Sequence, residues 1–101
     1  MANEHQIWRV PDYLQLRWQS WGEAENTQFV VFNCFSGETH CLNLTAGLVL
    51  HYLQTEAASA SELSAAIQQA LPGGANADAL QQIPDLLREF DQVGLIAPVS
   101  P

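Results

Sequence analysis

The chain contains no lysine. Its 101 residues include three arginines and eleven carboxylates, which gives a formal net charge of −8. Nucleic-acid binding depends largely on Lys and Arg side chains that neutralise phosphates, and an amphipathic membrane anchor needs a basic polar face. The charge balance therefore predicts a protein that binds neither nucleic acid nor a membrane. Its acidity serves solubility or attracts a cationic partner, and the charge alone leaves both interpretations open.

Long apolar runs are also missing. The longest, Leu42–Leu50, contains three interruptions and falls far short of the roughly 20 residues that span a bilayer. The N-terminal residues MANEHQ have neither the basic nor the apolar region of a secretory signal. Hydrophobic residues make up 48% of the chain and charged residues 14%, which favours a globular protein. We expect one cytoplasmic domain over residues 1–101.

Cysteine is scarce. Cys34 and Cys41 are too few for a disulfide scaffold, and their C-x6-C spacing is not that of a redox or zinc pair. With His40 they form the only near-cluster of metal ligands, whereas a zinc site needs about four converging ligands. A hairpin that pairs residue i with residue 73 − i would place both sulfurs on one face and His40 on the other. We therefore expect no metal and no cofactor.

Motifs for catalysis are absent as well. Ser36, Glu38 and His40 could be drawn as a nucleophile with its partners, but they crowd one turn and no nucleophile elbow surrounds the serine. Gly73-Gly74 follows a predicted helix and lacks the lysine of a phosphate-binding loop. The sequence therefore predicts no catalytic residues and a protein that is not an enzyme.

Strand character is concentrated in the first half of the chain. Ile7–Val10 and Leu14–Trp21 are strand-like, and the second alternates apolar and polar residues. Gln28–Cys34 is dense in Phe and Val. The turn Phe35–Glu38, with Ser-Gly at its centre, then leads into a short strand, Thr39–Asn43. We expect these last two strands to form an antiparallel hairpin.

Helical periodicity dominates the second half. Asn43 is a predicted N-cap for a helix that continues to about Glu56. Its expected inward residues are Leu44, Leu48, Val49, Tyr52 and Leu53. Ser59 and Glu62 form a capping box that opens a second helix to about Leu71. Its expected inward residues are Leu63, Ala66, Ile67 and Ala70. The following Pro72-Gly73-Gly74 is expected to end this helix.

A third helix is predicted from about Asp78 to Val93, with Gly94 as its C-cap and apolar Leu95-Ile96 folding back after it. Its apolar stripe consists of Leu80, Ile83, Leu87 and Phe90. Pro84 is out of place inside a helix because it lacks the N–H and clashes with the preceding turn. Either the helix kinks there, or its regular part begins near Ile83 with the proline at the first position.

These elements predict an α+β fold, in which a few N-terminal strands are followed by three helices that pack on one face of the sheet. The short strand Thr39–Asn43 would leave one edge without a partner strand. Such an edge is either covered by a helix or the tail or available to an incoming peptide strand, and the pattern is compatible with both.

Three blocks of the sequence, FNCFSGETHCLNLTAGLVLHYL, SASELSAAI and LLREFDQVGLIAP, resemble the PqqD-like family of peptide chaperones, also called RiPP recognition elements. The resemblance is to the branch named for the HPr-rel-A system and runs from about Trp8 to Pro98. It implies an N-terminal three-stranded antiparallel sheet followed by three helices in a winged-helix-like arrangement. It also implies a non-catalytic chaperone that binds the leader peptide of a precursor and presents it to a modifying enzyme. An HPr-kinase-like neighbour is the other implied partner.

The resemblance also implies a binding site, because peptides in such relatives add to the third strand and lie against the third helix. The implied peptide-binding residues are Thr39, His40, Cys41 and Leu42 on the strand, and Leu80, Ile83, Leu87 and Phe90 on the helix, some of which must instead fill the core. The chain departs from the branch pattern in three places: Cys34 replaces a proline, Leu44-Thr45 replaces Pro-Leu, and Pro84 interrupts the helix.

Two other interpretations remain. A winged-helix nucleic-acid binder is disfavoured because Arg88 stands among Asp85, Glu89 and Asp91 on the candidate recognition helix. The second interpretation is a structural subunit without a peptide ligand. The hairpin edges of two copies would pair with each other in a homodimer.

Overall fold

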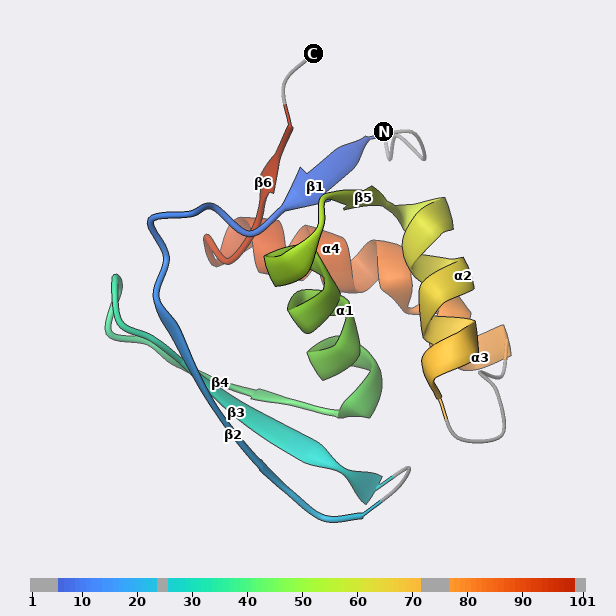
Figure 1. The fold of residues 1–101 in the computed structure, drawn as a ribbon, viewed down its shortest axis with the longest axis horizontal. Helices are drawn as coiled ribbons and strands as arrows, with labels where there is room; N and C mark the ends of the chain where they lie inside the picture. Colours follow the sequence, from blue (N-terminus) through green and yellow to red (C-terminus); the bar gives the residue numbers. More distant parts are fainter. Residues whose placement is uncertain (1–5, 24–25, 72–76, 100–101) are drawn as a thin grey trace.

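The computed structural model describes residues 6–23, 26–71 and 77–99. Its elements follow in the order β1 (Ile7–Arg9), β2 (Leu16–Trp21), β3 (Gln28–Asn33), β4 (Thr39–Leu42), α1 (Leu44–Thr55), β5 (Ala58–Ser59), α2 (Ala60–Ala70), α3 (Ala77–Gln81), α4 (Ile83–Gln92) and β6 (Ala97–Pro98). The predicted α+β class is confirmed. Figure 1 shows α1 and α4 between two small sheets at opposite ends of the molecule.

Strands β2, β3 and β4 form one antiparallel sheet with β3 in the middle. The predicted hairpin is confirmed, but its predicted register is wrong by two residues. Val30 faces Cys41 and Phe32 faces Thr39, so residue i pairs with residue 71 − i. Cys34 consequently lies in the loop after β3 and has no strand partner in β4.

The side chain of Asn33 explains the wider hairpin loop. Asn33 is 1% exposed, and its Oδ1 accepts the N–H groups of Phe35 and Ser36 at 2.9 and 3.3 Å. The backbone of the same residue accepts from Gly37 N–H and donates to the Glu38 carbonyl, both at 2.8 Å. An Asx turn therefore closes a five-residue loop where the sequence suggested a tight Ser-Gly turn.

The expectation of a single sheet is also corrected. β1 does not join the hairpin sheet but pairs antiparallel with β5 on one side and with β6 on the other. Trp8 lies opposite both Ala58 and Pro98. This second sheet joins three segments that are distant in sequence, and two of its strands contain only two residues.

Both predicted helix starts are confirmed. The Asn43 side chain accepts the N–H of Ala46 at 2.8 Å at the start of α1. At the start of α2, Ser59 Oγ accepts the Glu62 N–H at 3.3 Å, and Glu62 Oε1 accepts the Ser59 N–H at 3.0 Å. These bonds occupy N–H groups that a helix start leaves without intrahelical partners. The expected stop at Pro72-Gly73-Gly74 lies outside the described residues.

The third predicted helix consists of two pieces. α3 ends at Gln81 and α4 begins at Ile83, with Pro84 in its first turn, where a missing N–H costs nothing. Of the two alternatives for the proline, the later start of the regular helix is therefore confirmed. The C-cap of α4 is Val93, one residue before the predicted Gly94. Gly94 follows it with a φ of +79°, and the Leu95 N–H donates to the Phe90 carbonyl at 2.9 Å, so the glycine ends the helix as expected.

One core joins the sheets and the helices. Its buried apolar residues are Val10, Leu14, Val31, Ala46, Val49, Leu50, Leu53, Ala58, Leu63, Ile67, Ile83, Leu87, Phe90, Leu95 and Ile96. The helical stripes are confirmed at their centres, whereas Leu44, Leu48, Tyr52 and Ala66 are only half-buried and Ala70 is exposed. In the part of the chain that the structure describes, no helix has the length and apolarity to cross a membrane.

Candidate functional site

Strand β4 is an edge of its sheet. Within the described residues it pairs with β3 alone, since the strand order is β2-β3-β4. An edge strand presents backbone N–H and C=O groups that no neighbouring strand has taken. Among the described residues, no further strand pairs with this edge.

The register determines which backbone groups face outward. In an antiparallel pair, residues that exchange hydrogen bonds alternate with residues that do not. The Asn33 N–H donates to the Glu38 carbonyl, so the pairs that follow it in alternation, Val31 with His40 and Phe29 with Leu42, are the hydrogen-bonded ones. The N–H and C=O groups of Thr39 and Cys41 therefore point away from β3, toward the open edge.

The side chains of β4 alternate across the sheet. Thr39 and Cys41 are exposed, whereas His40 and Leu42 are half-buried and Leu42 packs against the core. Nε2 of His40 is buried and meets no hydrogen-bond partner among the described residues. A strand added beside β4 would place alternate side chains on these two faces. Its inward side chains would lie beside His40 and Leu42.

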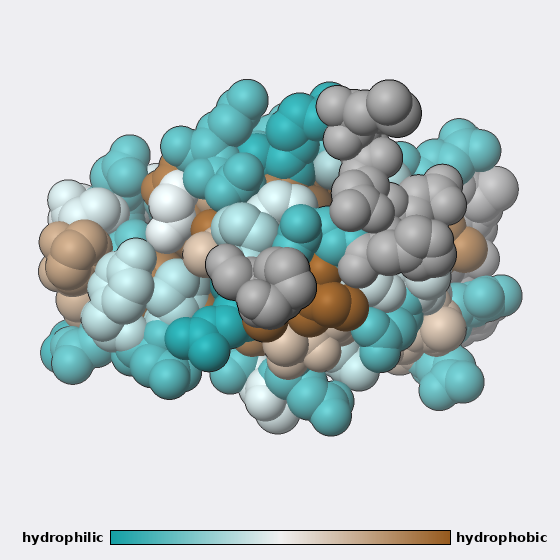
Figure 2. All heavy atoms as spheres, turned by 90° about the horizontal axis from the view of Figure 1, so that it is seen from above, coloured by the Kyte–Doolittle hydropathy of each residue, from teal (hydrophilic) through white to brown (hydrophobic). Residues whose placement is uncertain are grey.

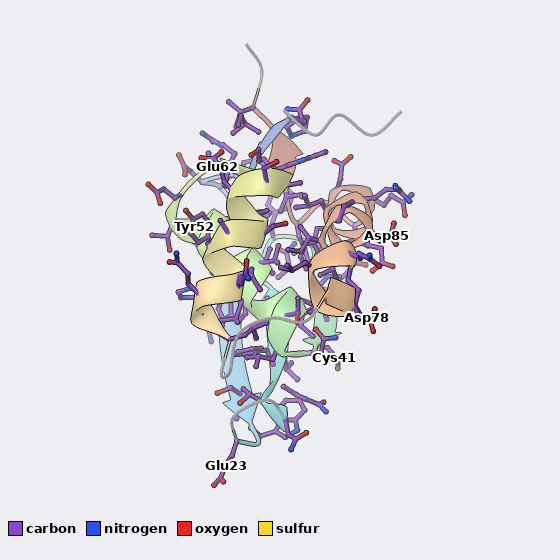
Figure 3. All side chains as sticks on the ribbon, turned by 90° about the vertical axis from the view of Figure 1, so that its right-hand side faces the viewer. Glu23, Cys41, Tyr52, Glu62, Asp78 and Asp85 are labelled. Atoms are coloured by element: carbon purple, nitrogen blue, oxygen red, sulfur yellow. The ribbon has the colours of Figure 1, made fainter. Side chains whose placement is uncertain are left out.

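Helices α3 and α4 lie toward the same side of the molecule as β4. Figure 3 shows Cys41 on β4, Asp78 on α3 and Asp85 on α4 together on that side. The Asp85 carboxylate pairs with Arg88 at 3.2 Å, and both side chains are more than half exposed. Acidic side chains of α3 and α4 therefore lie on the side of the molecule that carries Cys41.

The structure divides the residues proposed on the helices into two groups. Ile83, Leu87 and Phe90 are 0%, 3% and 4% exposed, so they hold α4 on the core. Leu80 on α3 is half-buried at the margin of the core and is the one member with surface to offer. The candidate site is thus Thr39, His40, Cys41 and Leu42 on β4, with Leu80 beyond it.

The residues considered for chemistry do not converge. Cys41 and His40 project to opposite faces of β4, as predicted, and Cys34 lies in the loop. No group of three or more potential metal ligands occurs among the described residues. Ser36 Oγ accepts the N–H of Glu38 at 3.2 Å, which gives this serine a role in the loop itself.

Two exposed aromatic residues were missed by the sequence analysis. Tyr13 and Phe35 lie in loops, where neither strand nor helix periodicity applies, yet their rings meet at a centroid distance of 5.1 Å. No local signal in the sequence pairs residues from these two loops. Their contact depends on the way the loop after β3 folds against the segment before β2.

Comparisons with protein families, with curated proteins and with solved structures find no match to this chain. The open edge of β4 and the resemblance in the sequence are therefore the features that point to a function.

Proposed function

We propose that this protein is a non-catalytic peptide chaperone that binds the leader peptide of a precursor, or a segment of a partner protein, by β-strand addition to β4. It then presents the bound peptide to a modifying enzyme. The observation that carries the proposal is the open edge of β4, where Thr39 and Cys41 offer their backbone N–H and C=O groups. Backbone hydrogen bonds supply affinity in this mode of recognition, and side-chain contacts supply specificity.

The surroundings of the edge support this assignment. On the inward face of the sheet, Leu42 is half-buried and offers apolar surface beside the edge. On the opposite face of the sheet, the side chains of Thr39 and Cys41 are exposed to solvent. The side chains that a bound strand directs to that face would therefore remain accessible to an enzyme.

The setting of the proposal follows the resemblance. The partners are a precursor peptide and either a modifying enzyme or an HPr-kinase-like neighbour, in the cytoplasm. The proposal gives the protein no cofactor, no metal and no catalytic residue. It also excludes nucleic acid, because the exposed face of α4 places Asp85, Glu89 and Asp91 around Arg88.

An NMR titration with precursor peptides encoded beside this chain tests the proposal. Binding should shift the amide signals of Thr39–Leu42 and protect the N–H groups of Thr39 and Cys41 from hydrogen exchange. Cys41→Pro should abolish binding because proline removes one outward N–H, whereas Cys41→Ala should retain it. Shifts confined to other parts of the chain, or unchanged affinity of the proline variant, would refute the proposal.

A second function is favoured by the same open edge. Two copies could pair their β4 strands across a twofold axis and form a homodimer without a peptide ligand. Sedimentation analysis at dilute protein concentration distinguishes the two functions. A dimer that Cys41→Pro dissociates, and that no peptide competes with, would support the structural role and contradict the chaperone.

A further inference from the structure

Tyr13 and Phe35 are the most exposed large hydrophobic side chains in the described part of the chain, at 64% and 69%. Their rings lie edge to face, with a centroid distance of 5.1 Å and an interplanar angle of 64°. Tyr13 belongs to the bend between β1 and β2, and Phe35 to the loop between β3 and β4. Neither ring contributes to the core, so the fold does not explain why two such side chains are held together in solvent.

Hydrogen bonds fix the backbone on both sides of this aromatic pair. The Phe35 N–H is held by Oδ1 of the buried Asn33 at 2.9 Å. The neighbouring Cys34 N–H donates to the Gln15 carbonyl at 2.8 Å, which ties the loop to the segment that carries Tyr13. Because the two rings are already positioned, a ligand that meets them has little ordering cost to overcome.

Carboxylates lie close in sequence to both rings. Asp12 precedes Tyr13, and its side chain is 97% exposed, with only a long contact of 3.8 Å to Arg9. Such an exposed pair contributes little, so this carboxylate remains available. Glu38 is exposed in the same loop as Phe35.

The end of the molecule that carries this loop differs from the face beside it. Figure 2 shows a largely hydrophilic face over β1, with tan and white residues gathered at the left end, where Figure 1 places the loop between β3 and β4. Aromatic ring faces attract cations through their quadrupole, and the carboxylates of the same two loops and the net charge of −8 act in the same direction.

We propose that Tyr13 and Phe35 form a docking point for an arginine side chain on a basic segment of a partner protein. Arginine fits better than lysine because its planar guanidinium stacks on aromatic rings while it pairs with carboxylates. This surface is distinct from the outward edge of β4. The inference therefore goes beyond the proposed function and does not depend on it.

The test uses the full chain, isotopically labelled, and a glycine-rich hexapeptide with two arginines. The matched probe carries citrulline, which keeps the planar shape and removes the charge. The arginine peptide should shift the ring signals of Tyr13 and Phe35 and the amides around them, and the citrulline peptide should bind much more weakly. The double variant Tyr13→Leu/Phe35→Leu, whose charge is unchanged, should lose affinity by about two- to fivefold.

The exchanged variant Tyr13→Phe/Phe35→Tyr preserves both rings and should keep the affinity. Equal binding of the citrulline peptide would overturn the inference, as would equal affinity of the leucine variant, because general acidity would then account for the binding. Shifts confined to Thr39–Leu42 would also overturn it and would leave the proposed function standing.

Discussion

The ring of Phe29 lies against the backbone of Gly47, in the space that a Cβ on this residue would occupy. Phe29 comes from the central strand of the hairpin sheet and Gly47 from the first turn of α1. The same ring meets Trp18 edge to face at 5.7 Å, and Trp18 Nε1 donates to Gln54 Oε1 at 2.8 Å. This contact fixes how closely α1 approaches the sheet whose edge is β4.

Gly47→Ala should destabilise the protein, although alanine favours a helix by about 1 kcal/mol over glycine. The added methyl overlaps the Phe29 ring, and overpacking of this kind costs about 1–3 kcal/mol. Urea unfolding followed by tryptophan fluorescence measures the difference. In a Phe29→Leu background, the smaller side chain should make the same substitution neutral or stabilising. An equal loss in both backgrounds would contradict the contact.

Proline substitutions should distinguish the two sides of β4. At Cys41 the N–H faces the open edge, so Cys41→Pro should cost less than about 1 kcal/mol, as edge prolines are tolerated. At His40 the N–H bonds to β3, and His40→Pro would leave the carbonyl of the fully buried Val31 unpaired, at a cost of about 1–3 kcal/mol. Denaturant midpoints of the two variants check this order. The reverse order would mean that the alternation derived for β4 is wrong.

Asn43 connects β4 directly to α1. The contribution of its capping hydrogen bond to stability can be separated from that of its side-chain volume. Asn43→Ala removes the acceptor for the Ala46 N–H and should cost about 0.5–2 kcal/mol. Asn43→Asp keeps an acceptor and adds a charge that the helix N-terminus favours, so it should preserve stability. The measurement is thermal unfolding of both variants at neutral pH. Equal loss in the two would show that the side-chain oxygen is not the stabilising group.

The stability of the fold should fall at high pH in a way that depends on Tyr52. Burial raises the pKa of Tyr52 above its ordinary 10.0, and the carboxylates of Glu56 and Glu62 raise it further. The folded state thus favours the neutral phenol. Its contribution is complete below pH 10 and is lost as the pH rises toward the folded pKa, because the unfolded chain ionises first. Figure 3 shows Tyr52 and Glu62 on the same side of the molecule.

Urea unfolding of the wild-type chain and of Tyr52→Phe, from about pH 8 to about pH 11, tests this dependence. The wild type should lose more stability over the range than the phenylalanine variant, since every other titrating group is common to both. Parallel curves for the two proteins would contradict the raised pKa.

Local signals in the sequence predicted those parts of the fold that depend on neighbouring residues. Asn43, the Ser59–Glu62 box and Gly94 were identified correctly because each acts within one helical turn. Pro84 left two alternatives that periodicity could not separate. The predicted register of the hairpin was wrong because the Asn33 side chain accepts two N–H groups of the loop. The resulting Asx turn makes the loop longer than the tight turn that Ser-Gly predicted.

Long-range pairing accounts for most of what the sequence did not predict. Ala58-Ser59 and Ala97-Pro98 are strands only because β1 lies between them, and two residues carry no periodicity of their own. The helix stripe was predicted correctly as apolar. Apolarity alone does not separate residues that fill a core from residues that line a surface, and three of the four proposed there proved to be buried.

The pairing of β1 with β6 brings the two ends of the described chain together, at the opposite end of the molecule from the hairpin sheet. A peptide tethered to either end must therefore pass the helical layer to reach β4, on a molecule that measures 34 × 30 × 21 Å. Short tethers would leave the edge empty, and longer ones would deliver the peptide at high effective concentration. Measuring binding as a function of tether length would therefore show whether a tethered peptide binds at β4 or nearer to the chain ends.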